Sequence, residues 1–258
     1  MSYLQALILS VVERITEFLP VSSTGHLILA SKILAIPQTE FTKTFEISIQ
    51  SGAIFAVVVL YGKRLLVNKQ LLVKVFFAFL PTAVLGLVFY KIIKNYLIGN
   101  LVVTVLSLFL GGILIILLEK YFQKQQTAGF NNNLKTLTTK QCFYIGLFQS
   151  ISMIPGVSRS AATIFGAMFL GLSRKEAVEF SFMLAIPTML SATGLDLVKS
   201  ASSFESSQLS ILLFGSLASF IFAYSTIKWL LNFIKQRDFI PFGIYRIVLA
   251  LAFLLLVK

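Results

Sequence analysis

The stretch Phe18–Gly25 (FLPVSSTG) interrupts an apolar segment that covers roughly residues 3–36. A second stretch, Ile154–Ser160 (IPGVSRS), interrupts another apolar segment at roughly 141–172. Each arm beside a break has only about 10–15 residues, whereas a helix needs about 20 to cross a bilayer. The simplest structure is a re-entrant helix–loop–helix that enters and leaves on one side of the membrane. Because broken backbone is tolerated at that depth only where protein or water surrounds it, we expect a functional site at the breaks.

The composition and the apolar runs of the rest of the chain predict membrane-spanning helices. Of the 258 residues, 57% are hydrophobic and only 12% are charged, whereas about a quarter of a soluble domain is charged. We therefore predict an all-α polytopic membrane protein that forms a single integral membrane domain over 1–258. Two pairs of small residues, Gly215 with Ser219 and Ser107 with Gly111, predict close helix packing. Six runs are long enough to span: 45–61, 71–90, 101–118, 177–198, 209–231 and 241–257.

The two broken segments resemble each other at an offset of 136 positions. Each is followed by three predicted spans, so we expect two repeats, 1–120 and 140–258, joined by a polar linker at 121–139. An odd number of crossings in each half makes the two repeats inverted relative to each other. The aligned pairs are Gln5 with Gln141, Glu13 with Gln149, Val21 with Val157 and Ser22 with Ser158.

The basic residues give the orientation. Lys and Arg number 22 against 10 acidic residues, and most lie in short connectors between apolar runs. On the predicted layout one side of the membrane receives 11 of them and the other side 6. The richer side is expected to be cytoplasmic, with both termini and the first hairpin facing outward. The clustering in connectors favours anionic head groups, and we expect no nucleic-acid partner.

Glu13 and Glu17 are four residues apart on the first arm, so a helix places both carboxylates on one face. Carboxylates at bilayer depth require a cation, shared protonation or a water-filled cavity. The alternative is an ordinary pair on a solvated helix, against which the flanking apolar residues argue. Arg14 lies between the two glutamates at the same depth, and the sequence offers no account of it.

Hydroxyl side chains stand at the start of the helix after each break. Ser22, Ser23 and Thr24 precede one helix, and Ser158 and Ser160 stand in the same relation to the other. Helix N-termini bind anions, and two facing termini would cradle a phosphate. The alternative is plain helix capping.

Two further side chains carry chemistry. His26, the only histidine, lies one turn past the first break and is either a structural hydrogen-bonding residue or a general acid, base or nucleophile toward phosphorus. Arg159 lies in the second break, where its planar donors suit two oxygens of one phosphate. The alternative for Arg159 is a salt bridge to Glu13 or Glu17, and both arrangements hold if substrate displaces the ion pair.

Taken together, Glu13–His26 (ERITEFLPVSSTGH) and Pro155–Thr163 (PGVSRSAAT) closely resemble the motifs of the undecaprenyl-diphosphatase family, also called the bacitracin-resistance family. Phe45–Gly52 and Phe182–Pro187 are similar to two further family segments, so the resemblance covers nearly the whole chain.

The resemblance implies hydrolysis of undecaprenyl diphosphate to undecaprenyl phosphate and inorganic phosphate, which recycles the lipid carrier of bacterial cell-wall synthesis. It implies a multi-pass enzyme of the inner (plasma) membrane with its active site toward the outer face, a polyprenyl diphosphate lipid as substrate, a divalent cation (Mg²⁺ or Ca²⁺), and a possible homodimer. The implied catalytic residues are Glu13, Glu17, Ser23, His26 and Arg159, with Glu13 and Glu17 as metal ligands and either Ser23 or His26 as nucleophile. The implied substrate-binding residues are Ser22, Thr24, Ser158, Ser160 and Thr163.

The sequence departs from the family pattern at two positions, and one function other than hydrolysis is also compatible with it. The family usually has glycine where Arg14 and Ala161 stand. Because inverted repeats with broken helices also build alternating-access carriers, the second interpretation is a transporter or flippase for a lipid phosphate or another anion. An acid pair with His, Ser and Arg is more than an anion carrier needs, which favours an enzyme.

Overall fold

The computed structural model describes residues 1–37, 39–97, 100–125, 134–200 and 209–256, and every regular element of this part of the chain is a helix. In chain order the elements are α1 (Tyr3–Phe18), α2 (Ser23–Ile33), α3 (Glu40–Val67), α4 (Lys69–Val88), α5 (Tyr90–Ile92), the π-helix η1 (Ile93–Leu97), α6 (Leu101–Gln125), α7 (Thr139–Ser150), the 3₁₀ turn η3 (Ile151–Met153), α8 (Arg159–Phe169), α9 (Arg174–Ser200), α10 (Leu209–Phe233) and α11 (Ile240–Leu256).

Five of these helices are long and apolar enough to cross a membrane: α3, α4, α6, α9 and α10. At 1.5 Å per residue the 25 residues of α6 or α10 span about 37 Å, more than the roughly 30 Å of a hydrocarbon core. The sixth predicted span corresponds to α11, which has 17 residues and stands at the lower limit of length. The expected all-helical, multi-pass architecture is therefore present.

The helix boundaries differ from the predicted ones in places where the apolar pattern ends before the helix does. The first span begins at Glu40, five residues before the expected start, because Thr39 caps the helix by accepting a hydrogen bond from the Thr42 amide. Helix α6 continues to Gln125, into the linker expected at 121–139. Residues 126–133 of that linker lie outside the described part of the chain.

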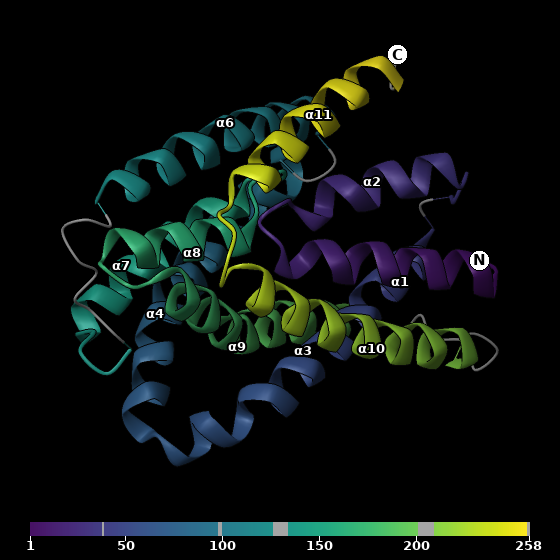
Figure 1. Ribbon diagram of the computed structural model, residues 1–258. Helices are drawn as coiled ribbons and strands as arrows, with labels where there is room; N and C mark the ends of the chain where they lie inside the picture. The colour runs from purple at the N-terminus through teal and green to yellow at the C-terminus, as the bar shows by residue number, and fades with distance from the viewer. Residues whose placement is uncertain (38, 98–99, 126–133, 201–208, 257–258) are drawn as a thin grey trace.

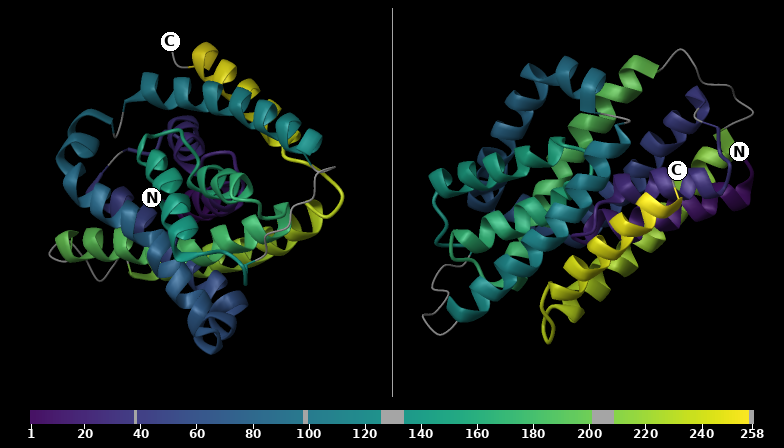
Figure 2. Two further views of the ribbon diagram at one scale, coloured as in Figure 1. Left: turned by 90° about the vertical axis from the view of Figure 1, so that its left-hand side faces the viewer. Right: turned by 90° about the horizontal axis from the view of Figure 1, so that it is seen from above.

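Each predicted break separates two short helices. Helices α1 and α2 flank the first break, and α7 with η3 and α8 flank the second; within each pair the two helices pack against each other. The pairs extend from the middle of the molecule toward opposite ends, α1 and α2 toward one end and α7 and α8 toward the other (Figure 1). Seen along the molecule, both pairs lie inside the longer helices (Figure 2, left).

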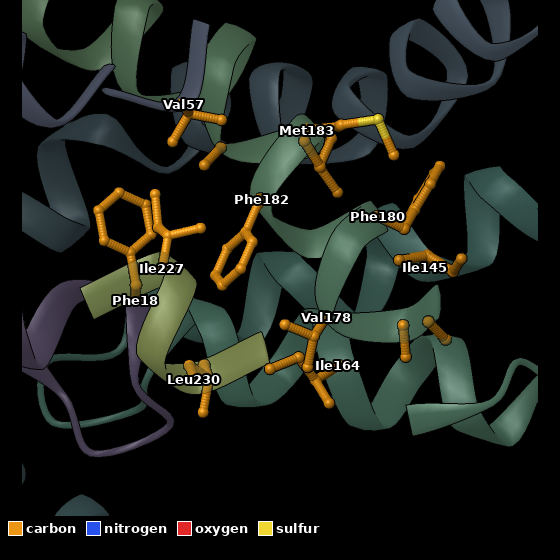
Figure 3. Packing of buried hydrophobic residues seen from close by; sticks show 14 of the residues in the cluster. Phe18, Val57, Ile145, Ile164, Val178, Phe180, Phe182, Met183, Ile227 and Leu230 are labelled. Atoms are coloured by element: carbon orange, nitrogen blue, oxygen red, sulfur yellow. The ribbon is translucent and has the colours of Figure 1, made fainter. Parts of the chain in front are cut away.

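The two breaks meet in the interior, where hydroxyl groups of the second bind carbonyls of the first. Ser160 Oγ donates to the Phe18 carbonyl at 2.9 Å, and Ser158 Oγ donates to the Leu19 carbonyl at 3.4 Å. Beside this junction Phe18, the last residue of α1, packs edge-on against Phe182 of α9 with ring centroids 5.5 Å apart (Figure 3). The apolar core that surrounds Phe18 includes residues of both halves of the chain.

Small residues allow the long helices to approach closely, as the sequence predicts. Gly215 of α10 lies against the Phe45 ring of α3, and Ser219 Oγ donates to the Ile49 carbonyl at 2.6 Å. On the other side of the molecule Gly111 of α6 lies against the guanidinium of Arg246 on α11. Both predicted packing faces are confirmed, and the second one positions an arginine that matters for the site.

Candidate active site

The two carboxylates of α1 point into the protein. Glu13 is 2% exposed and Glu17 is 16% exposed. Each has an arginine as its partner: Glu13 forms an ion pair with Arg14, and Glu17 Oε1 accepts from Arg159 Nη2 at 2.9 Å. The alternative of an ordinary pair on a solvated helix is therefore wrong, because both side chains lie in the interior.

Ser23 is the hydroxyl that meets a carboxylate. It is the first residue of α2, and its Oγ donates to Glu17 Oε2 at 2.6 Å. The residue before it, Ser22, has a φ of 71°, a left-handed conformation that is uncommon for a residue other than glycine. Strained backbone of this kind is found where the surrounding structure holds a functional group in place. Here it carries Ser23 back over the end of α1, onto Glu17.

Arg159 joins the second break to the first hairpin. It is the first residue of α8 and is 11% exposed. Besides its ion pair with Glu17, its Nη1 donates to the Ser181 carbonyl of α9 at 3.2 Å. The structure thus contains the salt bridge that was the alternative to phosphate binding. The Arg159 guanidinium and the Ser23 hydroxyl therefore bond the two oxygens of one carboxylate.

The other hydroxyl residues assigned to substrate binding play different parts. Ser158 caps α8 by accepting from the Ala161 amide at 3.1 Å, whereas Ser22 makes no side-chain cap at the start of α2. Ser160 bonds the first break, as described above, and Thr163 Oγ1 shares a 2.5 Å hydrogen bond with Ser181 Oγ. Thr24 is exposed at the start of α2. Three of the five hydroxyls therefore bond protein groups in this structure.

His26 is bonded at both ring nitrogens. Its Nδ1 lies 2.7 Å from the Ser22 carbonyl, which can only accept, so Nδ1 carries a proton. Its Nε2 lies 2.7 Å from the Tyr245 hydroxyl, and the two rings stack with their planes 9° apart. His26 thus holds the carbonyl of the strained residue next to Ser23. With Nε2 occupied by Tyr245, the ring has no free nitrogen to attack phosphorus in this arrangement.

Arg246, which is 1% exposed, is a residue of the site that was not predicted from the sequence. Its guanidinium donates to four backbone carbonyls: Pro20 at 3.3 Å, Gly156 at 2.8 Å, Ser107 at 2.9 Å and Leu108 at 3.3 Å. Pro20 and Gly156 belong to the two breaks, so one side chain ties both breaks to α6. The signal was present, because an arginine in the apolar run 241–257 is costly and marks a site by default.

The carboxylates leave little room for a metal ion. Three of their four oxygens already have partners, and Glu13 Oε2 alone has none. A divalent hard cation prefers six or more oxygen ligands. Within the described part of the chain no three His, Cys, Asp or Glu side chains are grouped so as to hold a metal. The arrangement therefore does not fit a dedicated metal site made by Glu13 and Glu17.

Known proteins match nearly the whole length of this chain. A family model described as "Bacitracin resistance protein BacA" matches residues 6–252. The chain is 51% identical over 249 residues to an undecaprenyl-diphosphatase of Aquifex aeolicus, with 96% of each protein covered. It is 50% identical over 255 residues to an undecaprenyl-diphosphatase of Sulfurihydrogenibium sp., with 99% of each covered. It is 44% identical over 249 residues to one of Thermus thermophilus, covering 95% of this chain and 94% of that protein.

Proposed function

The chain belongs to the bacitracin resistance protein BacA family, and we propose that it hydrolyses undecaprenyl diphosphate to undecaprenyl phosphate and inorganic phosphate. One observation supports this function above the others. Ser23, Glu17 and Arg159 form a continuous chain of hydrogen bonds, 2.6 Å from the hydroxyl to the carboxylate and 2.9 Å from the carboxylate to the guanidinium. Phosphoryl transfer requires a nucleophile, a base that takes its proton and a positive charge near the phosphate, and these three groups can supply them.

In the first step Ser23 Oγ attacks the terminal phosphorus of the diphosphate while Glu17 Oε2 takes its proton. The bond between that phosphorus and the bridging oxygen breaks. Polyprenyl phosphate leaves with the electron pair of that bond, and Glu17 gives the proton to it. The terminal phosphoryl group is then an ester of Ser23. Arg159, beside the same carboxylate, binds the equatorial oxygens on which charge accumulates.

In the second step a water attacks the phosphoryl group and gives its proton to Glu17, which returns it to Ser23 Oγ as the ester bond breaks. Inorganic phosphate is the second product, and one water is consumed in the cycle. The geometry favours Ser23 over His26 as the nucleophile, because Ser23 has a base at hydrogen-bonding distance. His26 acts as a positioning residue through the Ser22 carbonyl.

The divalent cation stays a prediction. The one carboxylate oxygen without a partner, Glu13 Oε2, can contribute at most a single protein ligand, and no step above depends on it. A magnesium ion that arrives with the diphosphate would be held mostly by phosphate oxygens and water.

We further propose that the two helix pairs are re-entrant hairpins within inverted repeats 1–120 and 140–258, in the bacterial inner membrane, with the site open to the outer face. The helix order supports this: each short pair is followed by α3, α4 and α6 in one half and by α9, α10 and α11 in the other. The uneven distribution of basic residues supports the orientation.

The test is phosphate release by the purified protein in detergent, with farnesyl diphosphate and undecaprenyl diphosphate as substrates. An enzyme releases one phosphate per diphosphate and leaves the lipid monophosphate, and it needs no second compartment. If neither substrate is hydrolysed while the protein moves lipid phosphate across vesicle membranes, the transporter alternative replaces this proposal.

A further inference from the structure

Buried polar atoms without a hydrogen-bond partner are concentrated at this site. Among the described residues seven such side-chain atoms occur, and five of them belong to Glu13, Arg14 and Arg159. Native proteins leave few buried polar groups unpaired, and each exception requires an explanation such as a ligand, an ion or water. The clustering of five in one place indicates that a polar partner belongs there.

The kind of atom left unpaired identifies the partner. Four of the five are nitrogens that donate, and only Glu13 Oε2 is an acceptor. Nη2 of Arg14 makes the ion pair with Glu13, so the donors left without any partner are Nε and Nη1 of Arg14 and Nε of Arg159. A metal cation would satisfy the acceptor and leave these three donors unpaired. An anion with several oxygens satisfies donors, and a guanidinium holds two such oxygens at once.

The charges around Arg14 agree with this. Arg14 is 0% exposed and forms an ion pair with Glu13, and it acts electrostatically on Glu17 as well. Arg14 thus already supplies, beside Glu13, the positive charge that a cation would otherwise bring. A buried guanidinium that lacks part of its hydrogen bonding is unfavourable, so Arg14 is explained best if a ligand completes its bonding.

We infer that Arg14 is a second phosphate-binding guanidinium of this chain, and that it, rather than a divalent cation, neutralises Glu13. This inference rests on the proposed hydrolase function, because the oxygens it assigns to Arg14 are those of the diphosphate. Glu17, at 16% exposed, and Arg159, at 11%, lie nearer the surface than Arg14, so Arg14 meets the terminal phosphate, the part of the substrate that enters deepest. Ordered water is the other possible partner of these donors, and it predicts no response to phosphate.

The experiment compares the wild type with Arg14→Gly and Arg14→Lys, in EDTA and in Mg²⁺. In EDTA, saturating inorganic pyrophosphate should raise the melting temperature of the wild type by about 5 °C and that of Arg14→Gly by less than about 1 °C. Addition of Mg²⁺ should restore the rise in Arg14→Gly, because removal of the side chain exposes Glu13 to the ion. Arg14→Lys keeps the charge without the fork and should show a smaller rise than the wild type.

Turnover gives the second measurement. Wild-type phosphate release in EDTA should stay within about threefold of its rate in Mg²⁺, whereas Arg14→Gly should lose at least about 30-fold in EDTA and recover in Mg²⁺. Arg174→Lys is the matched control, because Arg174 also bonds a buried carboxylate, Glu119, on other helices. It should leave both the pyrophosphate response and the EDTA response unchanged.

Three results would overturn the inference: a wild type that loses its turnover in EDTA, an Arg14→Gly variant with the wild-type pyrophosphate response, or an Arg14→Lys variant that binds pyrophosphate as the wild type does. Failure of the proposed function is a different result. In that case no variant hydrolyses the lipid in either buffer, while the melting shifts with pyrophosphate still report on Arg14.

Discussion

The first break, between α1 and α2, and the second, between η3 and α8, begin from related sequences, but Ser22 and Ser158 occupy corresponding positions with different backbones. Ser158 has a φ of −69° and caps its helix through the Ala161 amide. Ser22 has a φ of 71° and makes no side-chain cap, and the next residue, Ser23, donates its hydroxyl to Glu17. In the second break the serine caps a helix, whereas in the first break a serine hydroxyl meets a carboxylate.

The same contrast separates Glu13 and Gln149, which also correspond at the offset of 136. Gln149 is fully buried and neutral, and its Nε2 donates to the hydroxyls of Thr82 and Thr188 at 2.8 and 3.1 Å. Glu13 is almost as buried but carries a carboxylate that is paired only with Arg14. In this respect the first helix pair holds the buried carboxylates, and the second contributes a single charged side chain, Arg159, to them. We propose that the reacting groups belong to the first pair.

The largest expected effect tests this division of roles directly. Ser23→Ala should lower phosphate release by roughly 10⁴-fold, as loss of one member of a nucleophile–base unit does. Glu17→Gln should lower it by at least about 100-fold. Ser158→Ala, the matched change in the second hairpin, should lower the melting temperature by a few degrees, as loss of a helix cap does, and leave most turnover intact. If Ser158→Ala is as inactive as Ser23→Ala, the two breaks do not differ in the way proposed.

Arg159 is the exception in the second hairpin, and its substitution should have the next largest effect. Arg159→Lys should fold and lose at least about 100-fold in turnover, because an ammonium cannot hold two phosphate oxygens at fixed spacing. Arg159→Ala should be inactive and less stable, since Glu17 loses its partner. Turnover and melting temperature should be measured together on both variants. A stable and fully active Arg159→Lys protein would show that the arginine is only a structural partner of Glu17.

Arg246 links the two breaks, so its loss should affect stability first. Arg246→Met removes the guanidinium donor from the Pro20 and Gly156 carbonyls, which lie outside the helices, at a cost of about 1–3 kcal/mol for each one that stays unpaired. The melting temperature should fall by at least about 5 °C, and turnover at a temperature where the protein is folded should fall about 10-fold. Arg64→Met is the control, because Arg64 pairs with Glu179 while 46% exposed. Equal losses in the two variants would contradict the assignment.

Much of this architecture follows from composition and pattern. Long apolar runs need helices in lipid, and two of these runs are interrupted by Pro20 and by Pro155 with Gly156 among hydroxyl residues, so the spans and the two breaks can be predicted from the sequence. Gly156, with a φ of 90°, lies against the Thr104 carbonyl, where a side chain does not fit. The ends of the helices were harder to predict from the sequence, because caps such as Thr39 extend a helix beyond its apolar run.

The candidate site could be predicted from the sequence only in part. The sequence places Glu13, Glu17 and Ser23 near one another because they are close along the chain. It does not show which carboxylate meets the hydroxyl, since that depends on the strained φ of Ser22. Arg246 lies 90 residues from Gly156 and 226 from Pro20, so its contacts depend on how α11 packs against α6, which local pattern does not specify.

The smallest effect concerns His26, and it separates positioning from catalysis. If His26 acts through the Ser22 carbonyl, the proton on Nδ1 is the part that matters, and the amide nitrogen of asparagine can occupy nearly the same place. His26→Asn should therefore keep turnover within about 10-fold of the wild type, whereas His26→Gln, whose nitrogen lies nearer the Nε2 position, should lose more. Tyr245→Phe removes the bond to Nε2 and should change turnover by less than either.

A nucleophilic histidine predicts a different order: His26→Asn and His26→Gln would both be inactive, and phosphate would be trapped on the histidine of the wild type during turnover. Rapid quenching with labelled diphosphate distinguishes the two, because a phosphohistidine is labile in acid and a phosphoserine is stable. Acid-stable label that is absent from Ser23→Ala supports the contrast between a reacting first break and its supporting residues, and acid-labile label on His26 refutes it.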